Sequence, residues 1–324
     1  MKGPLHFAPP AMSPPAERPL LALVGPTAVG KTAFALELCE ELGLAIASLD
    51  SMQVYRRMDV GTAKPTPAER ARVPHHLIDL VEPAERYDAR RYLSDAEALR
   101  ARLAGEGKAA LFVGGAGLYL KALASGLFGG PPVDLALRAR LQERARELGR
   151  AALHAELAGR DPAAAARIHP NDEKRVVRAL EVLEQTGRPL SDWQREWGWN
   201  GPAAEARSMC VLGLALAPAA LEPRIRRRIR AMLAGGWVEE ASAIRAAGGF
   251  GPTAIQALGY REVLAHADGE LGAAELEERL VQLTRRFVRR QNTWFRSFPG
   301  IHWLDPGSSE ARAEARRRLG VSGS

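Results

Sequence analysis

The feature that most constrains this chain is an eight-residue segment near its start, Gly25-Pro-Thr-Ala-Val-Gly-Lys-Thr32, which matches the phosphate-binding pattern G-x-x-x-x-G-K-[S/T]. A short apolar run, Leu20–Val24, precedes the segment and predicts a buried parallel strand. Good helix-forming sequence follows it from Ala33 onward. A strand, a loop and a helix N-terminus in this order direct backbone N–H groups and the positive end of a helix dipole at one anion. The segment therefore predicts a site for a phosphate or pyrophosphate group.

Every residue of this segment is expected to contribute to that site. The glycine-rich backbone would surround the phosphates, the ammonium group of Lys31 would reach the outer phosphates, and the hydroxyl of Thr32 would bind Mg²⁺. The predicted phosphate-binding residues are Gly25, Pro26, Thr27, Ala28, Val29, Gly30, Lys31 and Thr32.

Short apolar runs alternate with helical patterns along most of the chain. Such alternation predicts an α/β fold, here a P-loop-type parallel sheet flanked by helices. Ligands bind such sheets beyond the carboxyl ends of the strands, so Asp50-Ser51 and Gly114-Gly115 should lie at the same edge as the phosphate loop. The predicted strands are Leu20–Val24, Leu44–Leu49, Ala109–Val113, Met209–Leu216 and Ile301–Leu304, and the predicted helices between them include Asp88–Leu103 and Leu118–Leu123.

One long interval lacks any strand pattern, and residues 131–205 are predicted to form an all-helical insertion domain. The α/β core is then expected from residues 19–130 and 206–306. Residues 1–18, rich in Pro and Ala, are expected to form a disordered tail, and residues 307–324 a C-terminal tail. The helical stretches of the insertion are Leu135–Glu147, Leu153–Leu157 and Glu173–Gln185.

Composition and motifs exclude several classes of protein. The chain has 324 residues, of which 46% are apolar, and it contains no apolar run long enough to span a bilayer. Its first residues lack the continuous apolar core of a signal peptide, and Cys39 and Cys210 form neither a metal-binding nor a disulfide pattern. We therefore expect a protein of the reducing cytoplasm that acts without a membrane. A monomer is also expected, although no sequence feature determines the oligomeric state.

The formal net charge of +7 favours a polyanionic partner. Residues 224–230 hold five arginines in seven positions, with Ile225 and Ile229 on the opposite face of the predicted helix. Arg224 and Arg228 are four residues apart and so point the same way. Residues 285–296 divide in the same manner into a basic arc and an apolar arc. Because neither run contains an acidic residue, nucleic-acid phosphates explain the two clusters better than a solvated helix face does.

Asp50 ends the second predicted strand and should face the same crevice as the phosphate loop. Its carboxylate could serve as a general base, bind a metal through water, or cap the turn that follows the strand. Ser51 and Gln53 are candidates for hydrogen bonds to a substrate, and a glutamine can pair two-fold with an adenine edge. The loop of residues 59–65, which contains a lysine after a glycine, is by itself more typical of a turn than of a site.

Taken together, these motifs resemble those of the tRNA dimethylallyltransferases. The resemblance covers about residues 20–305, and the succession of the motifs is far more specific than any one of them. The matching segments, in order, are Gly25–Thr32, Asp50–Tyr55, Gly61–Pro65, Pro74–Asp79, Val113–Gly115 with Leu118-Tyr119, Ile168–Asp172 with Arg175 and Arg178, Ala257–Tyr260, and Arg290-Gln291 with Thr293–Arg296.

The resemblance implies transfer of a dimethylallyl group from dimethylallyl diphosphate to N6 of adenine 37, next to the anticodon of tRNA, with release of pyrophosphate. Lys31, Thr32 with Mg²⁺, and an arginine of the Arg224/Arg228 pair would neutralise the leaving group, and Asp50 would accept the N6 proton. The adenine would flip out of its stack into a channel that the diphosphate enters from the other end. The residues that the resemblance implies as substrate and tRNA contacts are Asp50, Ser51, Met52, Gln53, Ala116, Arg138, Lys174, Arg175, Val176, Val177 and Arg178.

One position departs from the family pattern. The family usually has threonine after the Gly-Gly pair, where this chain has Ala116, which offers no hydroxyl. Three alternatives also remain open: transfer of the same group to free AMP, ADP or ATP, phosphoryl transfer by a small-molecule P-loop kinase, and RNA binding without catalysis. The basic clusters and the helical insertion favour tRNA over a free nucleotide as the acceptor. ATP consumption would identify the kinase, and Mg²⁺-dependent binding of a diphosphate analogue would argue against RNA binding without catalysis.

Overall fold

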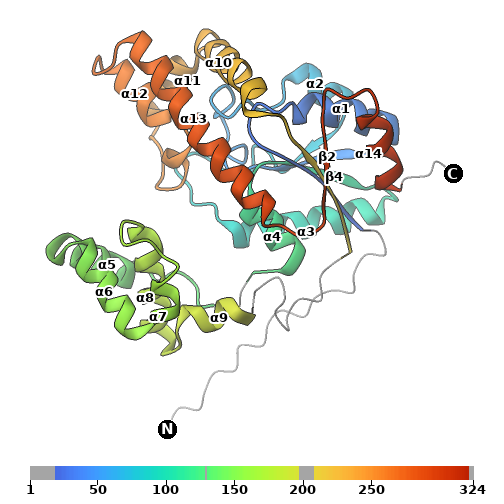
Figure 1. The fold of residues 1–324 in the computed structure, drawn as a ribbon. Coiled ribbons are helices and arrows are strands. Elements are labelled where there is room, and N and C mark those ends of the chain that lie inside the picture. Colours follow the sequence, from blue (N-terminus) through green and yellow to red (C-terminus); the bar gives the residue numbers. More distant parts are fainter. Residues whose placement is uncertain (1–18, 128–129, 197–207, 321–324) are drawn as a thin grey trace. The chain divides into compact units, whose positions relative to one another are not determined.

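Six parallel strands form one sheet in the order β3-β2-β4-β1-β5-β6 (Figure 1). The computed structural model describes residues 19–127, 130–196 and 208–320. All residues of the central strand β1 are buried, as expected for a strand covered on both faces. The strands are β1 (Leu20–Val24), β2 (Ala45–Leu49), β3 (His75–His76), β4 (Ala110–Gly114), β5 (Met209–Leu214) and β6 (Ile301–Leu304).

The order of the strands places a binding crevice directly after β1. The strands β4, β2 and β3 lie to one side of β1, and β5 and β6 lie to its other side, so the strand order reverses at β1. Ligands of open α/β sheets bind beyond the carboxyl ends of the strands at such a reversal. The phosphate segment follows β1 immediately, and the predicted parallel sheet is thereby confirmed with small shifts in strand boundaries.

Helices cover the sheet and extend beyond its carboxyl edge. This α/β unit spans Pro14–Ala124 and Arg207–Ser324, and α10 and α13 pack against each other within it (Figure 1). No helix in the described part of the chain combines the length and apolar character needed to cross a bilayer. The helices of the unit are α1 (Lys31–Leu42), α2 (Pro67–Arg72), α3 (Ala89–Gly105), α4 (Gly117–Ser125), α10 (Pro218–Ala234), α11 (Trp237–Ala246), the short 3₁₀ helix η1 (Ala254–Gln256), α12 (Tyr260–Ala267), α13 (Ala273–Arg296) and α14 (Ala311–Leu319).

The expected C-terminal tail, residues 307–324, is corrected over half of its length, because the helix α14 folds there and packs on the α/β unit. This helix contacts α1 and β5, and it buries alanine and leucine side chains at helical spacing. Arg312 and Arg316 form ion pairs with Glu37 and Glu41 of α1 at 2.7 and 3.2 Å. The buried side chains of α14 are mostly alanines. The sequence therefore has only a weak apolar stripe there, and its charged residues suggest an exposed tail instead of a packed helix.

The residues between Ser125 and Ala206 form a second unit, which is all-helical in its described part. Its core gathers the apolar faces of α5, α6 and α8. The predicted N-terminal tail, residues 1–18, lies outside the described residues. The helices of this unit are α5 (Leu135–Leu148), α6 (Arg150–Arg160), α7 (Pro162–Ala165), α8 (Glu173–Thr186) and α9 (Leu190–Glu196).

Candidate active site

The segment of residues 25–30 connects β1 to α1 and leaves the N-terminus of α1 open to an anion. Gly30 precedes the helix with φ of 107° and has no side chain that could cap it, so the first N–H groups of α1 keep their hydrogen-bonding capacity. A Cβ at Gly25 would lie 2.6 Å from the carbonyl oxygen of Leu214, so only glycine lets the loop pass the end of β5. The backbone of this loop therefore has the form of a phosphate cradle.

The ammonium group of Lys31 lies inside this loop. Its Nζ atom donates hydrogen bonds to the carbonyl oxygens of Gly25 and Pro26, each at 2.9 Å. Burial, and to a smaller extent the Arg228 cation, lowers the pKa of Lys31 to about 7, while the Asp50 carboxylate acts in the opposite direction. A bound anion would stabilise the charged form and raise that pKa again.

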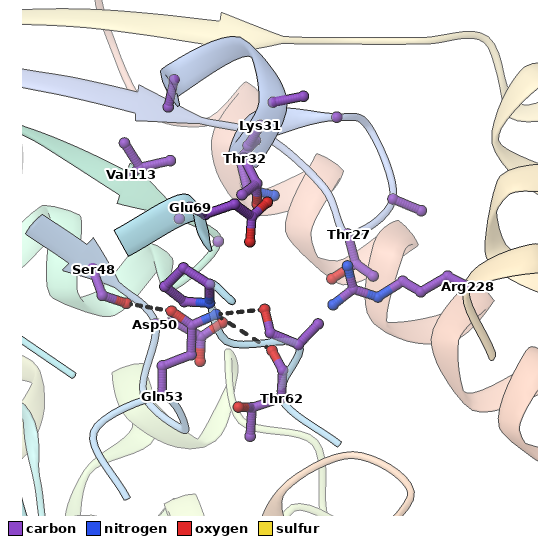
Figure 2. A pocket seen from close by; sticks show the side chains of 18 of the residues that line it. Thr27, Lys31, Thr32, Ser48, Asp50, Gln53, Thr62, Glu69, Val113 and Arg228 are labelled. Atoms are coloured by element: carbon purple, nitrogen blue, oxygen red, sulfur yellow. Dashed lines mark hydrogen bonds between the residues drawn. The ribbon is translucent and has the colours of Figure 1, made fainter. Parts of the chain in front are cut away.

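A cavity of about 580 Å³, here called the phosphate cavity, lies over the loop (Figure 2). Arg224 and Arg228 of α10 both line it, as their spacing of one helical turn predicts. Arg224 also donates a hydrogen bond to the carbonyl oxygen of Val29 at 3.2 Å, which ties α10 to the loop. The polar residues that face this cavity include Thr27, Lys31, Thr32, Asp50, Gln53, Arg224, Arg227 and Arg228.

A second cavity of about 380 Å³, here called the acceptor cavity, adjoins the phosphate cavity. Aliphatic and aromatic side chains line it together with polar and charged ones, among them Gln256, Glu262 and Thr284. Ala116, at the start of α4, lines this cavity with a methyl group where the family pattern would have a hydroxyl. The two cavities share Thr27, Asp50, Thr62, Gly115 and Arg228 as lining residues. The residues that line only the acceptor cavity include Ser51, Met52, Ile229, Met232, Trp237, Leu258, Arg261, Phe287 and Arg290.

Asp50 stands at the boundary between the two cavities. Its Oδ1 atom accepts a hydrogen bond from the backbone N–H of Met52 at 2.8 Å, which fixes the carboxylate in the turn after β2. Its Oδ2 atom receives no hydrogen bond from the described residues. One carboxylate oxygen is therefore committed to the fold, and the other is available to a substrate.

The predicted substrate residues beside Asp50 differ in whether their side chains are available for hydrogen bonds to a substrate. Ser51 lines the acceptor cavity. The amide of Gln53 is already bonded within the protein: Oε1 accepts from the Ser48 hydroxyl at 2.8 Å, and Nε2 donates to the carbonyl oxygens of residues 62 and 63 at 3.3 Å (Figure 2). Two-fold pairing of Gln53 with an adenine edge would require those bonds to break.

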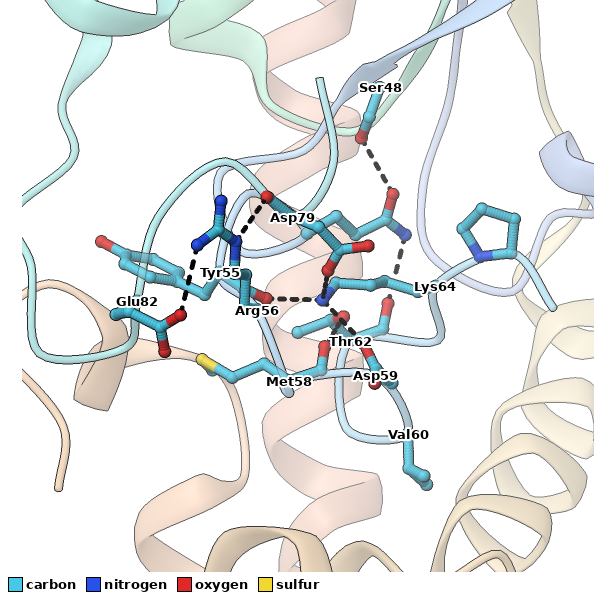
Figure 3. A network of polar contacts seen from close by, with 12 residues as sticks. Ser48, Tyr55, Arg56, Met58, Asp59, Val60, Thr62, Lys64, Asp79 and Glu82 are labelled. Carbon is cyan, nitrogen blue, oxygen red and sulfur yellow. Dashed lines mark hydrogen bonds and ion pairs between the residues drawn. The ribbon is translucent and has the colours of Figure 1, made fainter. Parts of the chain in front are cut away.

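The loop that the sequence marks only as a turn is built around a buried lysine (Figure 3). The Lys64 side chain is 1% exposed, and its Nζ atom donates to the carbonyl oxygen of Tyr55 at 2.5 Å and to the carboxylates of Asp59 and Asp79 at 2.7 and 2.6 Å. Burial alone would raise the pKa of Asp79, but hydrogen bonds from Lys64 and Arg70 outweigh it and hold that pKa below its usual value. One cation thus joins three parts of the segment that follows β2.

We expect Lys64→Met to lower the free energy of unfolding by about 2–3 kcal/mol, because three acceptors lose their donor. Asp59 and Asp79 are partly exposed, so water would replace part of what they lose. The matched control is Lys108→Met, which breaks an exposed ion pair with Glu106 and should cost less than about 0.5 kcal/mol. Urea unfolding of the three proteins checks this, and equal midpoints for the two variants would contradict it.

The two arginine helices do have acidic partners, contrary to the prediction from the two runs alone. Glu222, just before the first run, pairs with Arg226 at 3.2 Å and with Arg285 of α13 at 2.6 Å. Glu277 of α13 pairs with Arg230 at 2.8 Å. The Glu222–Arg226 pair is local to α10, whereas the pairs of Glu222 with Arg285 and of Glu277 with Arg230 form only because α10 packs against α13. The exposed arginines of the second run, residues 285–296, are Arg286, Arg289, Arg290 and Arg296.

In the helical unit, two of the predicted tRNA contacts are bound to a buried acid. Glu181 is completely buried, and its carboxylate pairs with Arg138 at 2.5 Å and with Arg178 at 3.2 Å. Arg178 also donates to the carbonyl oxygen of Pro131 at 2.8 Å. These arginines are about one quarter exposed (29% and 23%), so each presents only part of its guanidinium to a partner.

The other predicted contacts of this unit divide between surface and core. Lys174 and Arg175 are exposed in the first turn of α8. Val176 and Val177 are 1% and 2% exposed and belong to the apolar core of the unit. An RNA at this surface would therefore meet the two basic side chains and not the two valines.

Sequence reasoning missed several residues that line the cavities. Thr62 lines both cavities, Trp237 and Phe287 line the acceptor cavity, and Gln291 lines the phosphate cavity. For Trp237 and Phe287 the sequence contains no signal that separates them from core residues. Gln291 did carry one, because it is a polar residue on the otherwise largely apolar buried stripe of α13.

Comparison with known proteins shows the family of this chain. The family model described as IPP transferase matches residues 53–298, and one described as isopentenyl transferase matches residues 19–78. A curated tRNA dimethylallyltransferase of Syntrophobacter fumaroxidans is 47% identical over 289 residues, which are 89% of this chain and 83% of that protein. One of Geobacter sulfurreducens is 46% identical over 288 residues, 88% of this chain and 91% of that protein.

Solved structures show the same relationship. The crystal structure of a full-length tRNA isopentenylpyrophosphate transferase from Bacillus halodurans matches with a TM-score of 0.68 and 34% identity, over 94% of this chain and 97% of that one. A structure of a eukaryotic dimethylallyltransferase acting on tRNA matches with a TM-score of 0.73 and 25% identity, over 93% and 78% of the two chains. With a family model matched over most of its length and relatives of nearly 50% identity, this chain belongs to the IPP transferase family.

Proposed function

We propose that this protein transfers the dimethylallyl group of dimethylallyl diphosphate to N6 of adenine 37 in tRNA and releases pyrophosphate. The observation that carries the proposal is the boundary between the two cavities. A phosphate cradle with Lys31 and Arg224 lies on one side of Asp50, and a cavity lined by Trp237 and Phe287 lies on the other. A diphosphate and a base bound in these cavities would meet at the Asp50 carboxylate.

The residues at that boundary match the chemistry of the reaction. The C–O bond of the allylic diphosphate breaks as the N6 lone pair forms a new N–C bond, and the pyrophosphate leaves with the electron pair. Lys31, Arg224 and Arg228 would stabilise the negative charge that develops on the leaving group. The Oδ2 atom of Asp50 would accept the N6 proton, because the described residues leave it without another partner.

Magnesium fits this site as a partner of the diphosphate. Mg²⁺ usually binds through one or two protein oxygens together with phosphates and water. The hydroxyl of Thr32 offers such an oxygen at the phosphate cavity. The described residues contain no group of three or more His, Cys, Asp or Glu side chains that could hold a metal by themselves. When bound, the ion would neutralise charge on the departing diphosphate.

Exposed cations support tRNA as the acceptor. Arg261 and Arg290 line the acceptor cavity, and further arginines of α13 lie exposed on the same helix. In the helical unit, Lys174 and Arg175 offer a second basic surface. The target adenine must leave its stack to reach Asp50, and an apolar cavity compensates for that unstacking. The free thiols of Cys39 and Cys210 support action in a reducing compartment such as the cytoplasm.

A single assay separates this proposal from its alternatives. The protein, Mg²⁺ and dimethylallyl diphosphate labelled in the allyl group are incubated with unmodified tRNA carrying adenines at 36–38, with the same tRNA carrying guanine at 37, or with AMP, ADP or ATP. We expect label in the first tRNA only. Label in a free nucleotide would identify an adenylate prenyltransferase instead. Binding of tRNA without transfer to any acceptor would contradict the proposed reaction.

A further inference from the structure

A buried glutamine on α13 joins the two loops that carry the reacting groups. Gln291 is 6% exposed, and it occupies the stripe by which α13 packs on the rest of the unit, next to Val288 and Phe295 in that stripe. A polar side chain costs free energy in such a position unless its amide finds partners. The structure shows which partners those are.

The amide of Gln291 bonds to two different loops through its two ends. Its Oε1 atom accepts the backbone N–H of Thr27, in the phosphate loop, at 2.9 Å. Its Nε2 atom donates to the carbonyl oxygen of Gly115, in the turn after β4, at 3.1 Å. A Cβ at Gly115 would lie 2.1 Å from Nε2, so the close approach requires a glycine at that position.

Both loops belong to the boundary between the cavities. Thr27 and Gly115 are among the residues that the phosphate and acceptor cavities share, and Ala116, next to Gly115, lines the acceptor cavity. One planar amide therefore sets the spacing between the loop that holds the diphosphate and the turn that borders the acceptor. Transfer between two bound groups is sensitive to this kind of spacing, and an error of about 1 Å can cost roughly 100-fold in rate.

We propose that Gln291 is a positioning residue for prenyl transfer: it fixes the phosphate loop against the Gly115 turn and so aligns the allylic carbon with the attacking nitrogen. The inference rests on the proposed function for its chemistry. Gln291 need not touch either reactant, and its neighbours on α13, Arg289 and Arg290, are exposed. The inward amide and the outward arginines thus have separate tasks on one helix.

Two substitutions remove different parts of this link. Gln291→Leu keeps roughly the same volume and removes both hydrogen bonds. Gln291→Glu keeps an acceptor for the Thr27 N–H but sets a carboxylate oxygen against the Gly115 carbonyl and adds an anion to the phosphate cavity. The matched controls are Gln282→Leu and Gln282→Glu, which make the same changes at an exposed position on the same helix.

The kinetic test is a single turnover with enzyme in excess over labelled tRNA and both substrates saturating. We expect the rate constant of Gln291→Leu to fall by about 30- to 100-fold, with the Kd of tRNA and of pyrophosphate changed less than about threefold. The rate constant of Gln291→Glu should fall by a similar factor, and this variant should also bind pyrophosphate more weakly. A merely structural role would lower the amplitude of the turnover or the Tm and leave the rate constant unchanged, and that result would overturn the proposal.

Amide hydrogen exchange tests the positioning without any reaction. The Thr27 N–H should be protected in the wild-type protein and in Gln291→Glu, and should exchange at least about tenfold faster in Gln291→Leu. Equal exchange in all three proteins would refute the link, whatever the activity. If the wild-type protein transfers no prenyl group, the proposed function fails, while the exchange of Thr27 still decides whether Gln291 holds the loop.

Discussion

The variant Asp50→Asn is expected to transfer the dimethylallyl group about 100- to 10,000-fold more slowly than the wild-type protein while binding tRNA equally well. Alkylated N6 must lose a proton, and Asp50 Oδ2 is the carboxylate oxygen at the boundary of the two cavities. Asparagine can still accept the Met52 N–H through Oδ1, so the turn after β2 should survive. Single-turnover rates with saturating substrates, together with filter binding of tRNA, measure the two quantities separately.

Diphosphate binding gives an independent check on this variant. The Asp50 carboxylate lies near the cations Lys31 and Arg228, so its removal makes the phosphate cavity more positive. Pyrophosphate should therefore bind Asp50→Asn as tightly as the wild-type protein or more tightly. Weaker binding would show that Asp50 serves the diphosphate through a metal and would argue against the role of proton acceptor.

The chain contains a closely matched control for this change. Asp305 follows β6 as Asp50 follows β2, and its Oδ1 atom accepts the N–H of Gly307 at 2.8 Å in the same kind of turn. Asp305 is exposed and lines neither cavity. Asp305→Asn should leave the rate of transfer within about twofold of wild type, because it makes the same chemical change at a position outside both cavities. A large loss in this variant would trace the effect to the turn and not to catalysis.

The parts of the site that could be predicted from the sequence are those that local sequence determines. The phosphate loop needs only a strand, its glycines and a helix start, all of which are contiguous in residues 20–42. Arg224 and Arg228 reach the same cavity because helical periodicity aligns them. Asp50 is placed by the parallel sheet, whose strand ends share an edge.

The parts that could not be predicted depend on contacts between distant segments. Gln291 and Thr27 are 264 residues apart in the sequence. The polar residue on the apolar stripe of α13 marks Gln291 as unusual, but no sequence feature indicates that Thr27 is its partner. The sequence predicts too many arginines without an acidic partner for the same reason. Glu222 pairs with Arg285 only when α10 packs against α13. Lys64 looked like a turn residue because its carboxylate partners Asp59 and Asp79 come together only when the loop folds around it.

The second large effect is expected at Lys31. Replacement by methionine should weaken the binding of pyrophosphate with Mg²⁺ by about 100-fold at pH 6.5, or about 2.7 kcal/mol, because it removes a buried cation from the phosphate cavity. The wild-type affinity should itself depend on pH. With a pKa of about 7, Lys31 is mostly charged at pH 6.5 and mostly neutral at pH 8.5, so the affinity should fall by roughly 20-fold across this interval.

Proton uptake identifies the group responsible for that fall. Bound pyrophosphate stabilises the ammonium form, so binding at pH 8.5 should take up about 0.7 of a proton, seen as a calorimetric heat that changes with the ionisation enthalpy of the buffer. Lys31→Met should lose this uptake and keep only the pH dependence of the ligand, whereas the exposed Lys108→Met should behave like the wild-type protein. If Lys31→Met still took up the same proton, the titrating group would lie elsewhere. The low pKa has a consequence for the reaction as well, because the lysine would regain its full charge only while a diphosphate occupies the loop and would give it up again as the pyrophosphate leaves.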